Sequence, residues 1–417
     1  MRVALLSLIE PGSAEPGSAP GSARGYLRIG GQSIARHQLG LALALGCSRI
    51  VFLAQSLSGE LVALQHVAED AGAQFHVIAA TRALAGLIAP DDELIVLGDG
   101  LVAMPDEVIG LLNTRPGVLV LPVESGLGAG FERIDINHSE AGAMRLPGRI
   151  AAGLAELPGE WSAPSALMRL AMQSGVPQVP LPPALLESGR WALVRSEEEA
   201  HRLEPRWLRL HTASDHRRSP GEALGAVLVQ WLGPAVLHAG TRPAVVAIAA
   251  AVTALLGLGS AWFGAATLGF VLLGLAWLLR YDADLLGRIE RDSLMLPQGW
   301  FKPAALFSWG LDLLFVVIAA WRSEIPPIAG VPVGTNAFAP LVLFGLLRLL
   351  PLALPRAGWT HWLGDRLVAG LALALASAVT GFDVIVMAAV AGLIAAGLIF
   401  PGNPRDIAPN PALTKQA

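Results

Sequence analysis

The stretch Glu93-Leu94-Ile95-Val96-Leu97-Gly98-Asp99-Gly100 decides how the first half of the chain is interpreted. Its apolar run has the length of a strand, and the Gly-Asp-Gly turn that follows ends it. Apolar residues without polar alternation are typical of a strand that is buried on both faces of a sheet. Ligands of such sheets bind at the carboxyl ends of strands, and Asp99 stands at that position.

Strand and helix patterns alternate on both sides of this stretch. We predict strands at 2–9, 49–54, 74–78, 93–97 and 117–122, and helices at 33–45, 61–71 and 105–112. This alternation predicts a Rossmann-like α/β domain, over residues 1–215, with a parallel sheet covered by helices on both faces.

The second half is too apolar for a soluble core. The chain is 53% hydrophobic and 15% charged, against about 25% charged in soluble domains. A membrane-spanning helix needs about 20 mostly apolar residues, and six segments qualify: 243–262, 264–280, 303–321, 336–354, 364–381 and 383–400. We expect an all-α transmembrane domain of about six helices at 241–402, an amphipathic juxtamembrane segment at 216–240 and a cytoplasmic tail at 403–417.

Loop charges predict the orientation, because cytoplasmic loops collect Arg and Lys. Loop 281–302 carries Arg288, Arg291 and Lys302, and the loop before the fifth span carries Arg356 and Arg366, with Arg348 close by. Both termini are therefore expected in the cytoplasm of a multi-pass inner-membrane protein. The first residues do not form a signal peptide.

Composition also excludes several classes of protein. A net charge of −4 argues against a basic nucleic-acid binder. A single cysteine, Cys47, excludes a disulfide scaffold and a cysteine-based zinc site.

A Pro-Gly-Ser-Ala repeat follows the first strand, at residues 10–25, and includes Gly21 and Arg24. Small residues let backbone N–H groups approach a phosphate, so the repeat is a candidate ligand loop. The alternative is a low-complexity insertion that binds nothing. Asp99 is open to two interpretations as well: a carboxylate for a divalent metal on a nucleotide phosphate, or an ordinary turn residue between glycines.

The segments Arg24–His37, Gly46–Phe52 and Leu97-Gly98-Asp99 resemble the MobA-like sugar-phosphate nucleotidyltransferases. The resemblance implies nucleotide binding by Gly21, Arg24 and Asp99, with Mg²⁺ or Mn²⁺ at Asp99. Arg24-Gly25 stands where that family has a Pro-Lys pair, and no lysine precedes Lys302.

Four segments from residue 217 onward resemble CDP-alcohol phosphatidyltransferases: Arg217–Pro220, Thr241–Pro243, Tyr281–Ser293 and Ser308–Asp312. The resemblance implies catalytic roles for Asp282, Asp284 and Asp312 and phosphate binding by Arg288. It also implies metal binding by Asp284 and Asp312, in addition to the metal expected at Asp99 in the first half. The two halves together are similar in layout to bifunctional inositol-phosphate cytidylyltransferase/phosphotransferases.

Each membrane-half candidate has an alternative interpretation. Asp312 falls near the middle of a predicted span, where a carboxylate costs about 2.5–3.5 kcal/mol on insertion scales. This predicts a polar cavity, unless the span boundary is misplaced. The charged residues at 282–292 fit an ordinary solvated loop face equally well.

Two functions therefore stay open. One is a membrane-bound transferase of polar-lipid or phospho-alcohol synthesis, with a nucleotide or CDP-linked donor and a lipid or phospho-alcohol acceptor. The other is a catalytically degenerate membrane partner or regulator of such an enzyme. A transporter is a third hypothesis, which only the six predicted spans suggest. Neither main reading involves nucleic acid, and a second copy of the chain is a further candidate partner.

Overall fold

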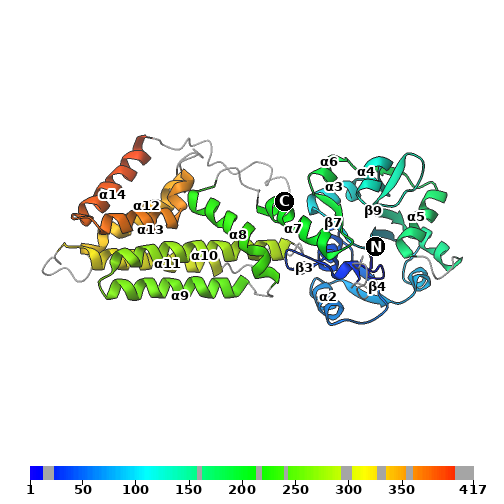
Figure 1. Cartoon of the computed structure of the whole chain (residues 1–417), viewed down its shortest axis with the longest axis horizontal. Helices are drawn as coiled ribbons and strands as arrows, with labels where there is room; N and C mark the ends of the chain where they lie inside the picture. The colour runs from blue at the N-terminus through cyan, green and yellow to red at the C-terminus, as the bar shows by residue number, and fades with distance from the viewer. Residues whose placement is uncertain are drawn as a thin grey trace, which may run out of the picture. The chain divides into compact units, whose positions relative to one another are not determined.

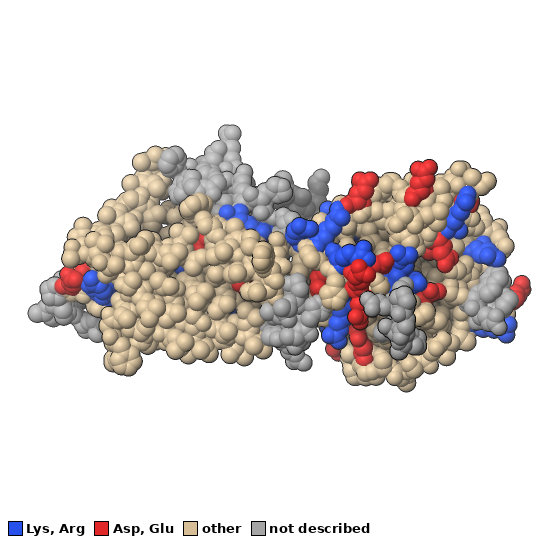
Figure 2. All heavy atoms as spheres, viewed as in Figure 1, with Lys and Arg blue, Asp and Glu red and all other residues tan. Residues whose placement is uncertain are grey.

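The computed structural model describes residues 1–12, 23–156, 162–212, 218–238, 243–292, 303–325, 335–353 and 360–399. It forms two compact units, Met1–His211 with Arg288–Gln298, and Thr212–Gly287 with Gly299–Ala417. We call residues 1–211 the head and the second unit the helical half (Figure 1). On the face shown in Figure 2, charged side chains gather on the head, whereas the helical half is mostly uncharged.

The head is built on a seven-stranded sheet with the order β10-β8-β9-β6-β1-β4-β5. Its strands are β1 (Arg2–Ser7), β4 (Arg49–Leu53), β5 (Gln74–Ile78), β6 (Glu93–Leu97), β8 (Gly117–Pro122), β9 (His138–Pro147) and β10 (Gln178–Pro180). Two small pairs accompany it: β2 (Arg28–Ile29) with β3 (Gln32–Ser33), and β7 (Leu101–Ala103) with β11 (Trp191–Leu193). Buried apolar residues fill both faces of the main sheet.

The predicted all-parallel sheet is wrong in one respect. β9 runs antiparallel between β6 and β8, and the sequence analysis assigned no strand there. Gly142, with φ of 75°, breaks the extended backbone in the middle of β9. Glu140, Gly142 and Arg145 also interrupt its apolar residues, so the strand lacks the continuous apolar run by which its neighbours were recognised.

The other predicted elements of the head are present within a few residues. The longer helices are α1 (Ile34–Ala44), α2 (Gly59–Asp70), α3 (Pro105–Thr114), α5 (Ala163–Gln173) and α7 (Glu197–Thr212). The short ones are α4 (Val123–Gly128), α6 (Ala184–Glu187) and the 3-10 helices η1 (Arg24–Tyr26), η2 (Thr81–Gly86) and η3 (Gly148–Glu156). Ser33 and Ser58 accept backbone hydrogen bonds at the starts of α1 and α2, which fixes where both helices begin.

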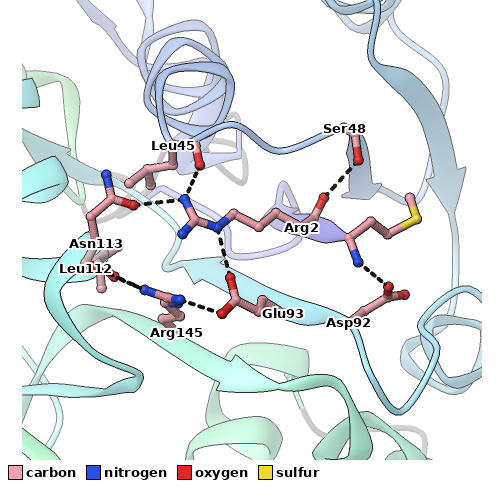
Figure 3. A network of polar contacts seen from close by, with 9 residues as sticks. Arg2, Leu45, Ser48, Asp92, Glu93, Leu112, Asn113 and Arg145 are labelled. Carbon is pink, nitrogen blue, oxygen red and sulfur yellow. Dashed lines mark hydrogen bonds and ion pairs between the residues drawn. The ribbon is translucent and has the colours of Figure 1, made fainter. Parts of the chain in front are cut away.

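A polar network joins three strands at the opposite edge of the sheet from Asp99 (Figure 3). Arg2 on β1 donates to Glu93 on β6 at 2.8 Å and to the Asn113 side chain at 2.8 Å. Arg145 on β9 pairs with the same Glu93 and donates to the Leu112 carbonyl at 2.9 Å. These hydrogen bonds lower the pKa of Glu93. The network ties the antiparallel strand to the parallel ones.

The helical half contains α8 (Pro220–His238), α9 (Pro243–Trp262), α10 (Ala266–Asp292), α11 (Pro303–Arg322), α12 (Thr335–Ala353), η4 (Thr360–Gly364), α13 (Arg366–Ser377) and α14 (Phe382–Ile399). Of the described helices, five are long and apolar enough to cross a membrane: α9, α10, α11, α12 and α14. The stacked rings of Phe270, Phe315, Phe344 and Phe382 lie in its core.

Two expectations about this half need correction. The segment predicted as a span at 364–381 is a helix of only 12 residues, α13. The loop predicted from 281 is helical to Asp292, because the 3.6-residue pattern of α10 continues and Arg280 pairs with Asp284 one turn later at 2.8 Å.

Candidate functional site

Asp99 follows β6 and is buried at the carboxyl edge of the sheet. Its Oδ2 accepts hydrogen bonds from the Ser7 hydroxyl at 2.9 Å and from the Glu10 backbone N–H at 3.0 Å. Its Oδ1 is buried and has no hydrogen-bond partner among the residues that the structure describes. A buried carboxylate oxygen without a partner is costly, so this atom is suited to receive a ligand.

Close backbone packing explains the glycines on both sides of Asp99. A side chain at Gly98 would press against Gly142 of β9, and one at Gly100, where φ is 80°, would meet the Val194 carbonyl oxygen at 2.2 Å. Gln38 on α1 donates to the carbonyls of Gly98 and Leu101 at 2.8 and 3.0 Å. Close backbone packing and the hydrogen bonds from Gln38 therefore fix the position of the turn that carries Asp99.

Asp99 lies in a cavity of about 180 Å³ together with three other carboxylates, Glu10, Glu132 and Glu140. Burial raises the pKa of Asp99 to about 6. Burial, followed by the nearby charge of Glu132, raises the pKa of Glu140 to about 7. The carboxylate of Glu10 adds to both shifts. Repulsion between these neighbouring carboxylates thus adds to burial in disfavouring their charged forms.

Positive groups line the same cavity. Arg24 and Arg195 contribute their side chains, and Ser162 and Ser165 place the first turn of α5 at its wall. Arg24 is 3.5 Å from Glu10, and Arg195 pairs with Glu199 at 2.8 Å. The positive end of the helix dipole attracts anions. The cavity thus offers carboxylates for a cation beside groups that attract phosphate.

A second cavity of about 580 Å³ shares Glu10, Glu132, Ser162 and Ser165 with the first. It extends over the ends of β4 and β5, where Gln55 and Thr81 line it. The two cavities form one cleft along the carboxyl ends of the strands, which is where α/β sheets bind ligands.

The structure brings two of the three predicted nucleotide-binding residues together. Arg24 and Asp99 line the same cavity. Gly21 lies outside the described residues, as does most of the Pro-Gly-Ser-Ala repeat. The sequence analysis missed Glu140 and Arg195, because the first stands on the unrecognised β9 and the second carries no local motif.

The predicted residues of the membrane half stand in different surroundings from those expected. Asp282 and Asp284 lie on α10 rather than in a loop. Asp282 is buried beside Gly225 of α8, and within the described part of the chain its Oδ1 has no hydrogen-bond partner. Arg288 is exposed on α10, as a solvated face would be.

Asp312 lies inside the helical half, at the middle of α11. Arg366 donates to its two carboxylate oxygens at 2.7 and 3.0 Å, and Arg348 pairs with it as well. The orientation argument counted both arginines as charges in or near a loop. The structure instead places Arg348 and Arg366 on α12 and α13, where they neutralise a buried carboxylate.

Asp365, which the sequence analysis did not single out, joins two helix N-termini. It caps α13 by accepting from Leu367 and Val368 at 2.9 and 3.1 Å. Its other oxygen accepts from the Gly221 N–H at the start of α8 at 2.6 Å. A carboxylate between two positive helix ends is stabilising.

The three predicted metal ligands lie in two different units, as the two separate predicted sites require. Asp99 belongs to the head, whereas Asp284 and Asp312 belong to the helical half. Among the described residues, no three His, Cys, Asp or Glu are grouped so that they could hold a metal ion. A cation at Asp99 would therefore need further ligands from a substrate.

Comparisons with solved structures find similarity in about half of the chain. A protein of Bacillus anthracis described as a glucose-1-phosphate thymidylyltransferase, in complex with sucrose, matches at 12% identity and a TM-score of 0.35, covering 49% of this chain and 93% of that one. A UDP-glucose pyrophosphorylase from Acinetobacter baumannii matches at 11% identity and a TM-score of 0.34, covering 51% of this chain and 94% of that one. No protein-family model and no curated protein sequence matches the chain.

The head is an α/β domain with a mixed parallel and antiparallel sheet and a cleft at the carboxyl ends of its strands. The chain joins this head to a helical domain that fits a membrane.

Proposed function

We propose that the chain is a membrane-bound transferase of phosphorus-containing groups that uses a CDP-linked donor, and that its head holds a nucleotide at Asp99. The unpaired Oδ1 of this buried carboxylate carries the proposal. Mg²⁺ is commonly bound by one or two carboxylates together with substrate phosphates and water. Asp99 fits that mode, and Arg24, Arg195 and the α5 N-terminus suit the phosphates.

The chemistry of the cleft fits transfer to a hydroxyl group. A bound Mg²⁺ or Mn²⁺ would neutralise charge on the transferring phosphate. Glu140, with a pKa of about 7, is suited to accept a proton from an attacking hydroxyl near neutral pH. Ser7 holds Asp99 in place through its 2.9 Å hydrogen bond.

Replacing Asp99 by asparagine is expected to weaken Mg²⁺-dependent nucleotide binding about 100-fold, or about 3 kcal/mol. The reason is that the amide keeps the size of the side chain but removes its charge. Isothermal titration of the full chain in nanodiscs with CTP, and with the other nucleoside triphosphates, measures the effect. Asp91→Asn, at an exposed position of the head, is the matched control. Equal nucleotide affinity of Asp99→Asn and Asp91→Asn would show that Asp99 does not contribute to nucleotide binding.

Cation binding in the cleft is expected to depend on pH. The pKa values of Asp99 and Glu140 are raised to about 6 and about 7, and a carboxylate must lose its proton to bind a metal. Affinity for Mn²⁺ should therefore rise with pH between about 5 and 8, most steeply from 6 to 7. Paramagnetic titration of the full chain with Mn²⁺ tests this. A flat profile would contradict it.

The second candidate function, a catalytically degenerate partner of such an enzyme, is favoured by the arginines on Asp312. A carboxylate paired with Arg348 and Arg366 is less available to a metal that holds a CDP-linked donor. Mass spectrometry of lipids from cells with and without the chain separates the two functions. Loss of one phospho-alcohol lipid in cells that carry Asp99→Asn supports the transferase. Lipids unchanged by Asp99→Asn, but altered by deletion of the chain, support the partner.

A further inference from the structure

An apolar groove of about 430 Å³ runs along α13 in the helical half, between α12 and α14. Leu343 and Leu347 of α12 form one side, and Ala372 of α13 and Ala389 and Gly392 of α14 form the floor and the other side. Among the described residues that line the groove, Asp365 alone is charged. Because small side chains face one another there, the helices leave a furrow rather than closing on each other.

Contacts at the two ends of α13 indicate the depth in a bilayer at which the groove lies. At the end of α13, the Ser377 carbonyl accepts from Arg322, the last residue of α11, at 3.3 Å. At its start, Arg366 pairs with Asp312, in the middle of α11. A helix of 12 residues is about 18 Å long, roughly half of a hydrocarbon core of about 30 Å. α13 and its groove therefore match one leaflet of a bilayer.

The deep end of the groove does not suit a polar group. Asp365 already accepts three backbone hydrogen bonds there, and its charge repels an anion. The sides are continuous with exposed apolar residues of α13 and α14, among them Leu375 (73% exposed) and Val384 (70% exposed). In a membrane such a surface contacts lipid tails.

We propose that this groove holds one acyl chain of a bilayer phospholipid, with the chain terminus at Asp365 and the glycerol end towards Ser377. Its occupant is neither a free fatty acid nor a second copy of the chain. The groove would act as a fixed lipid site on the helical half. This proposal does not depend on nucleotide binding by the head.

Photocrosslinking of the full chain in phosphatidylethanolamine–phosphatidylglycerol nanodiscs tests the proposal. The probe is a phosphatidylcholine with a diazirine near one acyl terminus, and peptide mass spectrometry locates the crosslinks. We expect crosslinks concentrated on the α13 and α14 residues of the groove. Ala372→Trp, which fills the groove, should reduce them about tenfold, whereas Leu371→Trp, at an exposed position of the same helix outside the lining of the groove, should leave them unchanged.

Thermal unfolding of both variants checks that they fold. If Ala372→Trp is unstable, Ala389→Trp on α14 is the second groove-filling variant. Crosslinks spread evenly over the exposed faces of α9 and α14, and insensitive to both groove-filling variants, would reduce the site to ordinary annular lipid and overturn the proposal. Labelling of the groove by a diazirine fatty acid in preference to the phospholipid, or crosslinks between two copies through α13, would overturn it as well.

Discussion

Asp312→Ala is expected to lower the stability of the helical half by about 3–5 kcal/mol, because it leaves buried arginine charge without its counter-charge. Arg366 is 4% exposed and donates to both Asp312 oxygens. Arg348 pairs with the same carboxylate and with Ser308. Thermal unfolding in nanodiscs, followed by tryptophan fluorescence, measures the change.

A triple variant separates this structural role from a metal-binding one. Asp312→Leu with Arg348→Met and Arg366→Met removes the whole ion network. Apolar replacement of a buried network is often neutral or stabilising, so stability should largely return. If Asp312 also holds a metal with a CDP-linked donor, Mg²⁺ and CDP protect the Asp99→Asn chain against unfolding, and they do not protect a chain that carries Asp99→Asn together with the triple replacement. If Asp312→Ala is as stable as the parent, the ion network does not stabilise the helical half.

Asp365→Ala is expected to cost about 2–4 kcal/mol, since it removes the cap of α13 and leaves buried N–H groups of two helices unpaired. Asp365 is 1% exposed, so water cannot replace it easily. Hydrogen exchange should quicken first at Gly221, Leu367 and Val368, whose amides it accepts. Asp365→Asn, which keeps one acceptor oxygen, should show an intermediate loss.

Gly221→Ala gives an independent test of the same contact. A Cβ at Gly221 would lie 2.6 Å from an Asp365 oxygen and 2.8 Å from the Trp277 ring. It should loosen the start of α8 while leaving the α13 cap in place. Gly259→Ala, at a position where a Cβ meets nothing, is the matched control. Equal exchange rates in the two glycine variants would contradict the close packing of α8.

The sequence by itself determined the elements that depend on local pattern. Apolar runs, turn residues and helical spacing placed β5, β6 and β8 at their observed bounds and α1 and α3 within two residues. They also placed Asp99 at the edge of the sheet that carries the cleft. Long apolar segments likewise indicated α9, α11, α12 and α14. These features follow from interactions between residues that are close in the chain.

Only the tertiary structure decided which distant residues meet. β9 becomes an antiparallel insertion through pairing with β6 and β8, and this places Glu140 in the cleft. Arg348 and Arg366 reach Asp312 from positions 36 and 54 residues away. No local periodicity encodes such partners, because the energy that selects them arises from packing and from charge neutralisation in a buried environment.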